Sequence, residues 1–203
     1  MKKFYIFDFD GTLVNTFYDS VIAYNKALKQ NNLPEYTYES LDQIDYSDFI
    51  NSMTEDMQVL KLYSKIYEES EKEYTLPYDG INEVLKELIK RGNEVAICSN
   101  RSQEQLEYYT EKLFPEIDFK YVIGYTPEGG FKPNPEVMNR ILNNVNYKKG
   151  EIVYIGDKKT DIVTAQNVEL DVIIVTWGQG DEEAYYDNYP IKIIDNVKEL
   201  LDF

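Results

Sequence analysis

Histidine is absent from this chain of 203 residues. Without imidazole, the protein cannot build a Ser–His or Cys–His nucleophile, and it cannot bind zinc through histidine. Acid–base chemistry near neutral pH must therefore come from carboxylates, lysine, tyrosine or water.

Cysteine is nearly absent too, because Cys98 is the only one. A single cysteine forms no internal disulfide, so we expect a reducing compartment and a cytoplasmic protein. Cys98 lies in an apolar run and is interpreted as a small buried residue. The basic start at residues 1–3 resembles a signal peptide, but Asp8 and Asp10 interrupt the apolar stretch too early. No run approaches the roughly 20 apolar residues of a membrane span.

Positive charge is scarce, with 21 Lys and Arg against 37 Asp and Glu, a net charge of −16. This balance argues against nucleic acid or an anionic membrane as the partner. A small phosphorylated metabolite would need local positive charge or a divalent cation. The length fits one domain, or one domain with a small insert. We expect a monomer or dimer, and the sequence does not decide between them.

From residue 77 onward, short apolar runs alternate with segments of helical periodicity. Strands are expected at 94–98, 121–125, 152–155, 171–177 and 190–194. Helices are expected at 81–89, 102–114, 161–167 and 197–203, and a further helix follows residues 132–135 and ends near Asn146. Solidly apolar strands that alternate with helices indicate a parallel sheet covered on both faces. The predicted fold class is α/β.

Residues 33–76 break this pattern, because they contain no strand-like run. Residues 57–67 have helical spacing, and Asp19 or Ser20 is expected to cap an earlier helix. We interpret the segment as a small helical insert.

Two carboxylates end the first apolar run. Asp8 and Asp10 follow residues 5–7 and precede Gly11, a pattern that predicts a buried strand entering a loop. Strand alternation would place both acids on one side, where they need a cation or a shared proton. The pair suits a metal-assisted reaction with one carboxylate as nucleophile. A strand end with solvated or helix-capping acids remains an equal alternative.

Other polar residues follow later strands. Ser99-Asn100 and Asp157 come directly after apolar runs, and Lys132 stands before a helix. In an open parallel sheet, chemistry collects beyond the carboxyl ends of the strands. A turn at Ser99-Asn100, a solvated Lys132 and a helix start at Asp161 are the structural alternatives.

Together these residues suit phosphoryl transfer. Asp8 would attack phosphorus, Ser99 would bind the phosphate oxygens, and Lys132 would neutralise their charge. Asp157, with Asp8, would hold a hard divalent cation, and Mg²⁺ suits such oxygen ligands.

Four segments carry a resemblance to a known family: Asp8–Leu13, Ser99-Asn100, Lys132-Pro133, and Gly156-Asp157 with Asp161. Their identity and order resemble the haloacid dehalogenase (HAD) superfamily across nearly the whole chain. The resemblance implies a Rossmann-like three-layer core, residues 1–16 and 77–203, with a small α-helical cap, residues 17–76. Residues 77–80 and 176–178 are similar to the phosphoglycolate-phosphatase-like members.

The resemblance also implies roles for the catalytic residues. Asp8 would be the nucleophile, and Asp10 the general acid that later acts as base. Ser99, Asn100 and Lys132 would bind the phosphate.

The metal site is implied in the same way. Mg²⁺ would be bound by Asp8, the backbone carbonyl of Asp10, and Asp157, while Asp161 would support the acidic loop. Lys158-Lys159 stands where the family commonly has a small residue, and this departure affects the charge beside the metal.

Dehalogenases lack a second acid at the position of Asp10, so the resemblance implies phosphate chemistry. We expect a Mg²⁺-dependent phosphatase that hydrolyses a small phosphate monoester through an aspartyl phosphate. A sugar phosphomutase with the same nucleophile is the nearest alternative. A non-catalytic, receiver-like signalling domain also uses Asp, a hydroxyl, Lys and Mg²⁺, but the second acid and the insert argue against it.

Overall fold

Alternating apolar side chains organise the central sheet. In the computed structural model, which describes residues 1–180 and 182–203, Tyr5 and Phe7 pack into one buried cluster. Phe4 and Ile6, their neighbours on the same strand, pack into a second cluster on the opposite face. A strand that is buried on both faces requires covering helices on both sides.

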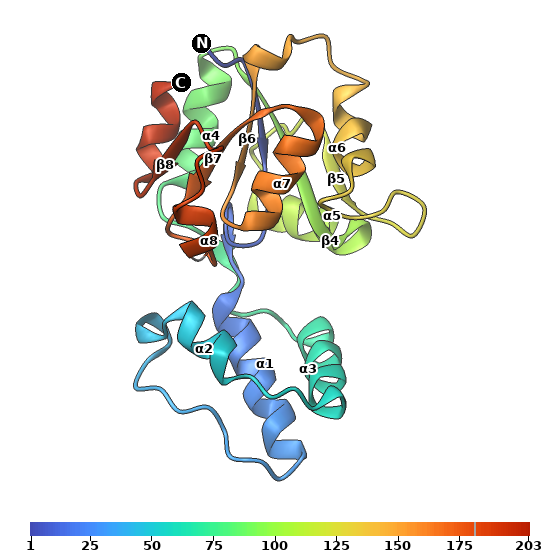
Figure 1. Ribbon diagram of the computed structural model, residues 1–203, viewed down its shortest axis with the longest axis vertical. Helices are drawn as coiled ribbons and strands as arrows, with labels where there is room; N and C mark the ends of the chain where they lie inside the picture. The colour runs from blue at the N-terminus through green and yellow to red at the C-terminus, as the bar shows by residue number, and fades with distance from the viewer. Residues whose placement is uncertain (181) are drawn as a thin grey trace. The chain divides into compact units, whose positions relative to one another are not determined.

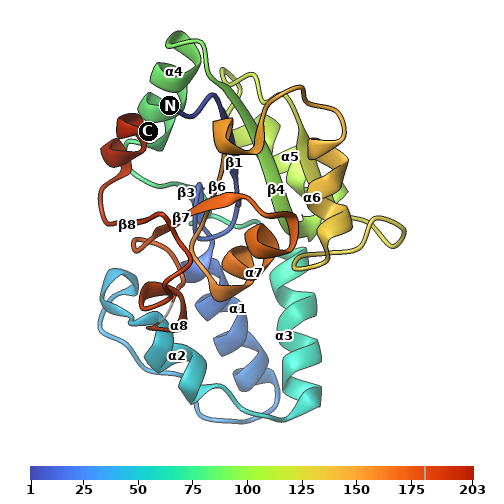
Figure 2. The ribbon, with the colours of Figure 1, turned by 45° about the horizontal axis from the view of Figure 1, so that its top comes forward.

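The sheet has the strand order β5-β4-β1-β6-β7-β8, and each of its pairings is parallel. Figure 2 shows β1, β4 and β6 side by side. The strands are β1 (Phe4–Phe7), β4 (Glu94–Ser102), β5 (Val122–Tyr125), β6 (Ile152–Gly156), β7 (Asp171–Val175) and β8 (Lys192–Ile194). The predicted α/β class, with a parallel sheet in a Rossmann-like core, is confirmed.

Helices cover both faces of this sheet (Figure 1). One face packs against α4 (Ile81–Lys90), α5 (Gln103–Leu113) and the 3₁₀ helix η3 (Val197–Asp202). The other packs against α6 (Pro135–Leu142), α7 (Lys159–Val168) and α8 (Glu182–Tyr185). A further 3₁₀ turn, η2 (Lys149–Glu151), leads into β6. The expected closing helix at 197–203 is wrong in type, because this segment forms 3₁₀ turns.

The central place of β1 decides where the first acids lie. Phe7 pairs with Ile97 of β4 and with Ile155 of β6, so the residues after these three strands emerge together. The backbone N–H of Asp8 still donates to the Ile155 carbonyl at 2.8 Å. The ends of β1, β4 and β6 therefore bring their polar residues to one edge of the sheet.

The chain divides into a core unit, Met1–Val14 with Pro77–Phe203, and an insert unit, Asn15–Leu76. The short strands β2 (Val14–Asn15) and β3 (Leu76–Pro77) lie where the chain passes between them. The ranges expected from the sequence were 1–16 with 77–203, and 17–76.

The insert unit contains α1 (Phe17–Gln30), η1 (Leu41–Gln43), α2 (Tyr46–Ser52) and α3 (Met57–Glu69). Its centre is aromatic: the ring of Phe49 lies 5.2 to 5.5 Å from those of Phe17, Tyr24 and Tyr36. Edge-to-face packing of this kind stabilises a small core beyond its buried area. Several tyrosines of this segment are therefore core residues.

The start of α1 differs from the expectation. The helix begins after Thr16, whereas Asp19 is buried inside its first turn and accepts hydrogen bonds from the Tyr74 N–H and the Thr75 hydroxyl. Asp19 thus ties α1 to the end of the insert and does not cap the helix. Among the described residues, no helix combines the length and apolarity that crossing a membrane requires.

Candidate active site

A cavity of about 250 Å³ lies at the carboxyl edge of the sheet, within the core unit. It is lined by Asp8, Asp10, Ser99, Asn100, Lys132, Lys158, Thr160 and Asp161. Asp157 is not among these lining residues, but its carboxylate and those of Asp8 and Asp161 have oxygens within 4.8 Å of one another. The structure therefore brings all of the predicted site residues to one place.

Lys132 is the buried cation of this site. Its ammonium lies 2.9 Å from Asp8 Oδ1 and 2.8 Å from Asp161 Oδ1, and it donates to the Tyr154 hydroxyl at 2.8 Å. Burial lowers the pKa of Lys132, but the charges of Asp161 and Asp8 outweigh burial and raise it above its ordinary value. The alternative of a solvated lysine is wrong, because Lys132 is 3% exposed.

Asn100 fixes the backbone that carries this lysine. Its side-chain Oδ1 accepts from the Lys132 N–H at 2.6 Å, and its Nδ2 donates to the Lys132 carbonyl at 3.2 Å. The peptide bond from Lys132 to Pro133 is cis. Asn100 therefore joins the end of β4 to the loop before α6, and its contact with phosphate stays a prediction.

Asp157 has a buried oxygen without a partner. Its Oδ2 accepts from the Gln179 N–H at 2.6 Å, whereas its Oδ1 has no hydrogen-bond partner within the described structure. Leaving a buried carboxylate oxygen unsatisfied is costly, and a bound cation removes that cost. A set of carboxylate oxygens suits a hard divalent cation.

The pKa values of the acids also show that negative charge is unfavourable at this buried site. Burial raises the pKa of Asp8 to about 7, with the charge of Asp161 adding to the effect and Lys132 opposing it. Burial, followed by the charges of Asp161 and Asp8, raises the pKa of Asp157 to about 8. Near neutral pH these acids therefore need either protons or a cation.

Asp161 organises the loop after β6. Its Oδ2 accepts from the backbone N–H groups of Asp157 and Lys158 at 3.1 and 3.0 Å, which fixes the start of α7. Its Oδ1 accepts from Lys132 and from the Tyr154 hydroxyl, each at 2.8 Å. A Cβ at Gly156 would lie 2.3 Å from the Asp161 carboxyl carbon, so only glycine fits there. Asp161 thus serves both the helix start and the buried lysine.

Arg101 is a site residue that the sequence reasoning missed. Its Nη2 lies 2.5 Å from Asp10 Oδ1, and its Nε donates to Asp10 Oδ2 at 3.2 Å. Its backbone N–H donates to the buried Ser99 hydroxyl at 3.2 Å. A basic residue directly after Ser99-Asn100, in a chain with so few cations, was the available signal. Tyr154, hidden in an apolar strand, gave no signal at all.

Cys98 lies one residue before this polar group and is fully buried. Burial raises the pKa of its thiol to about 12, so the thiol stays protonated at neutral pH. The interpretation of Cys98 as a small buried residue agrees with this placement.

The family model for haloacid dehalogenase-like hydrolases matches residues 5–175. The chain belongs to this family. The expected resemblance to HAD-like hydrolases, in the phosphoglycolate-phosphatase-like subgroup, is therefore confirmed.

Named relatives of this HAD-like hydrolase are phosphatases. It is 22% identical to the phosphoglycolate phosphatase of Pseudomonas savastanoi pv. phaseolicola, over 99% of this chain and 79% of the relative. It is 26% identical to the pyrophosphatase PpaX of Bacillus mycoides, over 97% of this chain and 94% of that protein.

Solved structures agree with this relationship. A candidate phosphoglycolate phosphatase from Lactobacillus delbrueckii subsp. bulgaricus superposes with a TM-score of 0.81 at 26% identity, over 98% of this chain and 97% of the other. A haloacid dehalogenase-like hydrolase from Streptococcus pneumoniae shares the fold at 19% identity, with a TM-score of 0.80 over 99% and 97% of the two chains. The HAD-like hydrolase described here is a phosphatase enzyme, as expected from its sequence.

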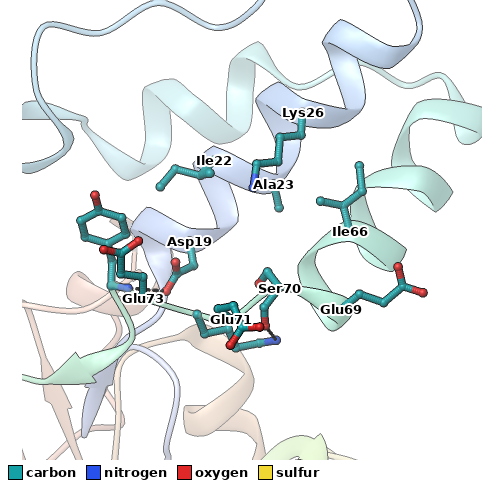
Figure 3. Close-up of a pocket in the computed structure, with 11 residues that line it drawn as sticks. Asp19, Ile22, Ala23, Lys26, Ile66, Glu69, Ser70, Glu71 and Glu73 are labelled. Carbon is teal, nitrogen blue, oxygen red and sulfur yellow. Dashed lines mark hydrogen bonds between the residues drawn. The ribbon is translucent and has the colours of Figure 1, made fainter.

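The insert unit of this HAD-like hydrolase has a cavity of its own, of about 320 Å³ (Figure 3). Lys26 and Asp19 of α1 and Glu69 of α3 lie around it, with Glu71 and Lys72. Lys72 is buried and donates to the Tyr67 and Glu68 carbonyls at 2.7 and 3.1 Å, which satisfies the C-terminal end of α3. Lys72 and Asp19 are therefore held by structural contacts within the insert unit.

Proposed function

We propose that this HAD-like hydrolase is a Mg²⁺-dependent phosphatase that hydrolyses a small phosphate monoester through an aspartyl phosphate on Asp8. The observation that carries the proposal is the buried group of Asp8, Lys132, Asp157 and Asp161 at the edge of the cavity. A family hydrolase with buried acids around one lysine has the parts that phosphoryl transfer needs.

Asp8 has one oxygen available for attack. Its Oδ1 accepts from the Phe9 N–H at 2.7 Å and faces Lys132 at 2.9 Å, which leaves Oδ2 for the reaction. In the first step, a bond forms between Oδ2 and phosphorus while the bond from phosphorus to the ester oxygen breaks. Water then attacks phosphorus, the Asp8 carboxylate is restored, and inorganic phosphate leaves.

Lys132 and Ser99 would hold the phosphoryl oxygens. Both are buried and line the cavity, so their donors are shielded from water and act strongly on developing charge. Asn100 contributes by fixing the Lys132 backbone. Because this cation is already held in place, little free energy is needed to reorganise it during the reaction.

Asp8, Asp157 and the backbone carbonyl of Asp10 would hold Mg²⁺, with Asp161 supporting their loop. When bound, the ion would neutralise the carboxylates and the charge on the phosphate oxygens. The unsatisfied Asp157 Oδ1 supports this assignment.

Asp10 would move the protons. The carboxylate lines the cavity, and no histidine is available to replace it. It would protonate the ester oxygen as it leaves and then accept a proton from the attacking water.

We also propose that residues 17–76 act as a cap that selects the substrate, and that the enzyme works in the cytoplasm, where the thiol of Cys98 stays reduced. Replacing the cap with that of another family member should change substrate preference more than turnover of p-nitrophenyl phosphate. An unchanged substrate profile would remove the cap from the proposal.

The test is phosphate release with Mg²⁺ from p-nitrophenyl phosphate and a panel of metabolite esters, by wild type, Asp8→Asn and Asp8→Ala. Loss of the nucleophile should reduce kcat by at least about 1,000-fold. Asp118→Asn, a change at an exposed acid of the core unit, serves as the matched control. A wild type without turnover, or Asp8 variants with substantial turnover, would refute the proposal. Incubation with a hexose 1-phosphate identifies a phosphomutase by its isomerised product.

A further inference from the structure

The pair formed by Arg101 and Asp10 has a role beyond stability. We propose that Arg101 is a positioning residue, which holds the Asp10 carboxylate in place to accept a proton from the water that hydrolyses phosphorylated Asp8. This inference rests on the proposed function, since it concerns the second half of that reaction.

The contact has the geometry of an orienting clamp. Two guanidinium nitrogens of Arg101 engage the two carboxylate oxygens of Asp10, at 2.5 Å for Nη2 and 3.2 Å for Nε. Two parallel hydrogen bonds fix the plane of a carboxylate, whereas a single bond leaves it free to rotate.

Arg101 is itself held firmly. Its Nη1 donates to Gln105 Oε1 of α5 at 3.2 Å, and its guanidinium carbon lies 5.8 Å from the ring centre of Phe9 and 5.2 Å from that of Tyr109. Cation–π contacts of this kind restrict the guanidinium plane. The clamp therefore transmits the rigidity of the core to Asp10.

Exposure differs across the pair. The Arg101 side chain is 5% exposed and Arg101 is not among the cavity-lining residues, while the Asp10 side chain is 28% exposed and lines the cavity with Asp8. Arg101 thus contacts Asp10 from the side away from the cavity and from Asp8. A carboxylate has about four lone-pair sites, so the two that Arg101 occupies leave others to face a water molecule in the cavity.

The backbone at the end of β4 directs the Arg101 side chain toward Asp10. The pairing of β4 with β5 shifts register between Cys98 and Ser102, and such irregularities re-aim side chains near active sites. Ser99 then lines the cavity, Asn100 holds Lys132, and Arg101 holds Asp10. Three successive residues therefore serve three different parts of one site.

The proposed step balances without a further reactant. A bond forms between the water oxygen and phosphorus, and the bond from phosphorus to Asp8 breaks with its electrons restoring the Asp8 carboxylate. The proton of the water passes to Asp10. p-Nitrophenol leaves as its anion and needs no protonation, so with this ester the first step makes little use of Asp10.

The experiment is rapid-mixing kinetics with p-nitrophenyl phosphate and saturating Mg²⁺ on Arg101→Met, which keeps the length of the side chain but loses its donors. We expect a burst that approaches one equivalent of p-nitrophenolate per enzyme, followed by a steady rate at least about tenfold below wild type. Because phosphorylation of Asp8 is spared, KM should fall with kcat, and kcat/KM should stay within about twofold of wild type.

Three further variants separate positioning from structure. Arg101→Lys keeps the charge without the fork and should give an intermediate steady rate. Gln105→Leu removes the anchor of Nη1 and should shift the rates in the same direction by less, which keeps the test valid if Arg101→Met folds poorly. Arg91→Met, at a surface arginine paired with Glu87, should behave as wild type.

Equal losses in kcat and kcat/KM without a burst, or rates equal to wild type, would overturn the positioning role of Arg101. A wild type that releases no phosphate would instead overturn the proposed function, and this inference with it. The two failures are therefore distinguished by the wild-type assay alone.

Discussion

In the absence of Mg²⁺, the free energy of unfolding of this protein should fall as the pH rises. Asp8 and Asp157 have pKa values of about 7 and about 8 in the folded protein, chiefly because they are buried. In the unfolded chain, a carboxyl of this type has an ordinary pKa near 4. With a chelator present, the folded state therefore holds protons between about pH 4 and 8 that the unfolded state has already lost.

Proton linkage gives both the direction and the size of this change in the free energy of unfolding. Stability falls with rising pH wherever the folded state binds more protons than the unfolded state. For two carboxyls with the folded pKa values above, the free energy of unfolding should fall by on the order of 4 kcal/mol between pH 6 and pH 9. Saturating Mg²⁺ should remove this dependence, because the metal-bound carboxylates carry no protons at either pH.

Few side chains other than these two acids contribute to the pH dependence of stability between pH 6 and 9. The chain has no histidine. Burial raises the pKa of the Cys98 thiol to about 12 in the folded protein, so the folded chain keeps this proton where an unfolded thiol, with a pKa of about 8.5, loses it. Cys98 therefore adds less than about 1 kcal/mol to the same downward slope, mostly above pH 8. The acids of the candidate metal site should dominate the slope.

Urea unfolding followed by the fluorescence of Trp177 is the assay. This single tryptophan donates from its indole to the Thr12 carbonyl at 3.1 Å, so its signal reports on the core unit. Titrations with chelator and with Mg²⁺ at pH 6, 7, 8 and 9 give the two slopes. Asp157→Asn should flatten the metal-free slope, whereas Asp118→Asn should not. A metal-free stability that is constant or rises over this range would refute the reasoning.

Three further perturbations test separate parts of the structure. Lys132→Met leaves the neighbouring carboxylates without their buried cation and should cost about 3–5 kcal/mol in metal-free urea unfolding; a cost below about 1 kcal/mol would contradict the buried ion group. Lys158→Ser removes a positive charge that lowers the pKa of Asp157, so calorimetry should show roughly three- to tenfold tighter Mg²⁺ binding, while Lys159→Ser, whose lysine pairs with Asp187, should bind as wild type. Phe49→Ala should destabilise the insert unit by about 3–5 kcal/mol in differential scanning calorimetry, and an unshifted transition would rule out the aromatic core described here.

Much of the fold could be predicted because its signals are local. Apolar runs of four or five residues identified β1, β6 and β7, since strands buried on both faces tolerate few polar residues. The start of α1 could not be predicted, because the role of Asp19 depends on Tyr74 and Thr75, more than 50 residues away. Aspartate is common at helix starts, but Asp19 makes a tertiary contact instead.

The candidate site shows the same division. The acids and Lys132 follow from residue type and from their places after strands, but their burial does not. Lys132 reads as a solvated lysine until the fold brings Asp8 and Asp161 within 2.9 Å of it. Arg101 was missed for this reason as well, because its partner Asp10 is 91 residues away in the sequence.

The shielded thiol of Cys98 has a practical consequence. Because the only native cysteine is buried and stays protonated, maleimide dyes should react only with cysteines introduced at exposed positions. Substituting Glu39 in the insert unit and Lys198 in the core unit with cysteine would accept a donor and an acceptor fluorophore without any prior removal of native thiols. Single-molecule energy transfer between them would then test whether the distance between the two labelled positions changes during turnover.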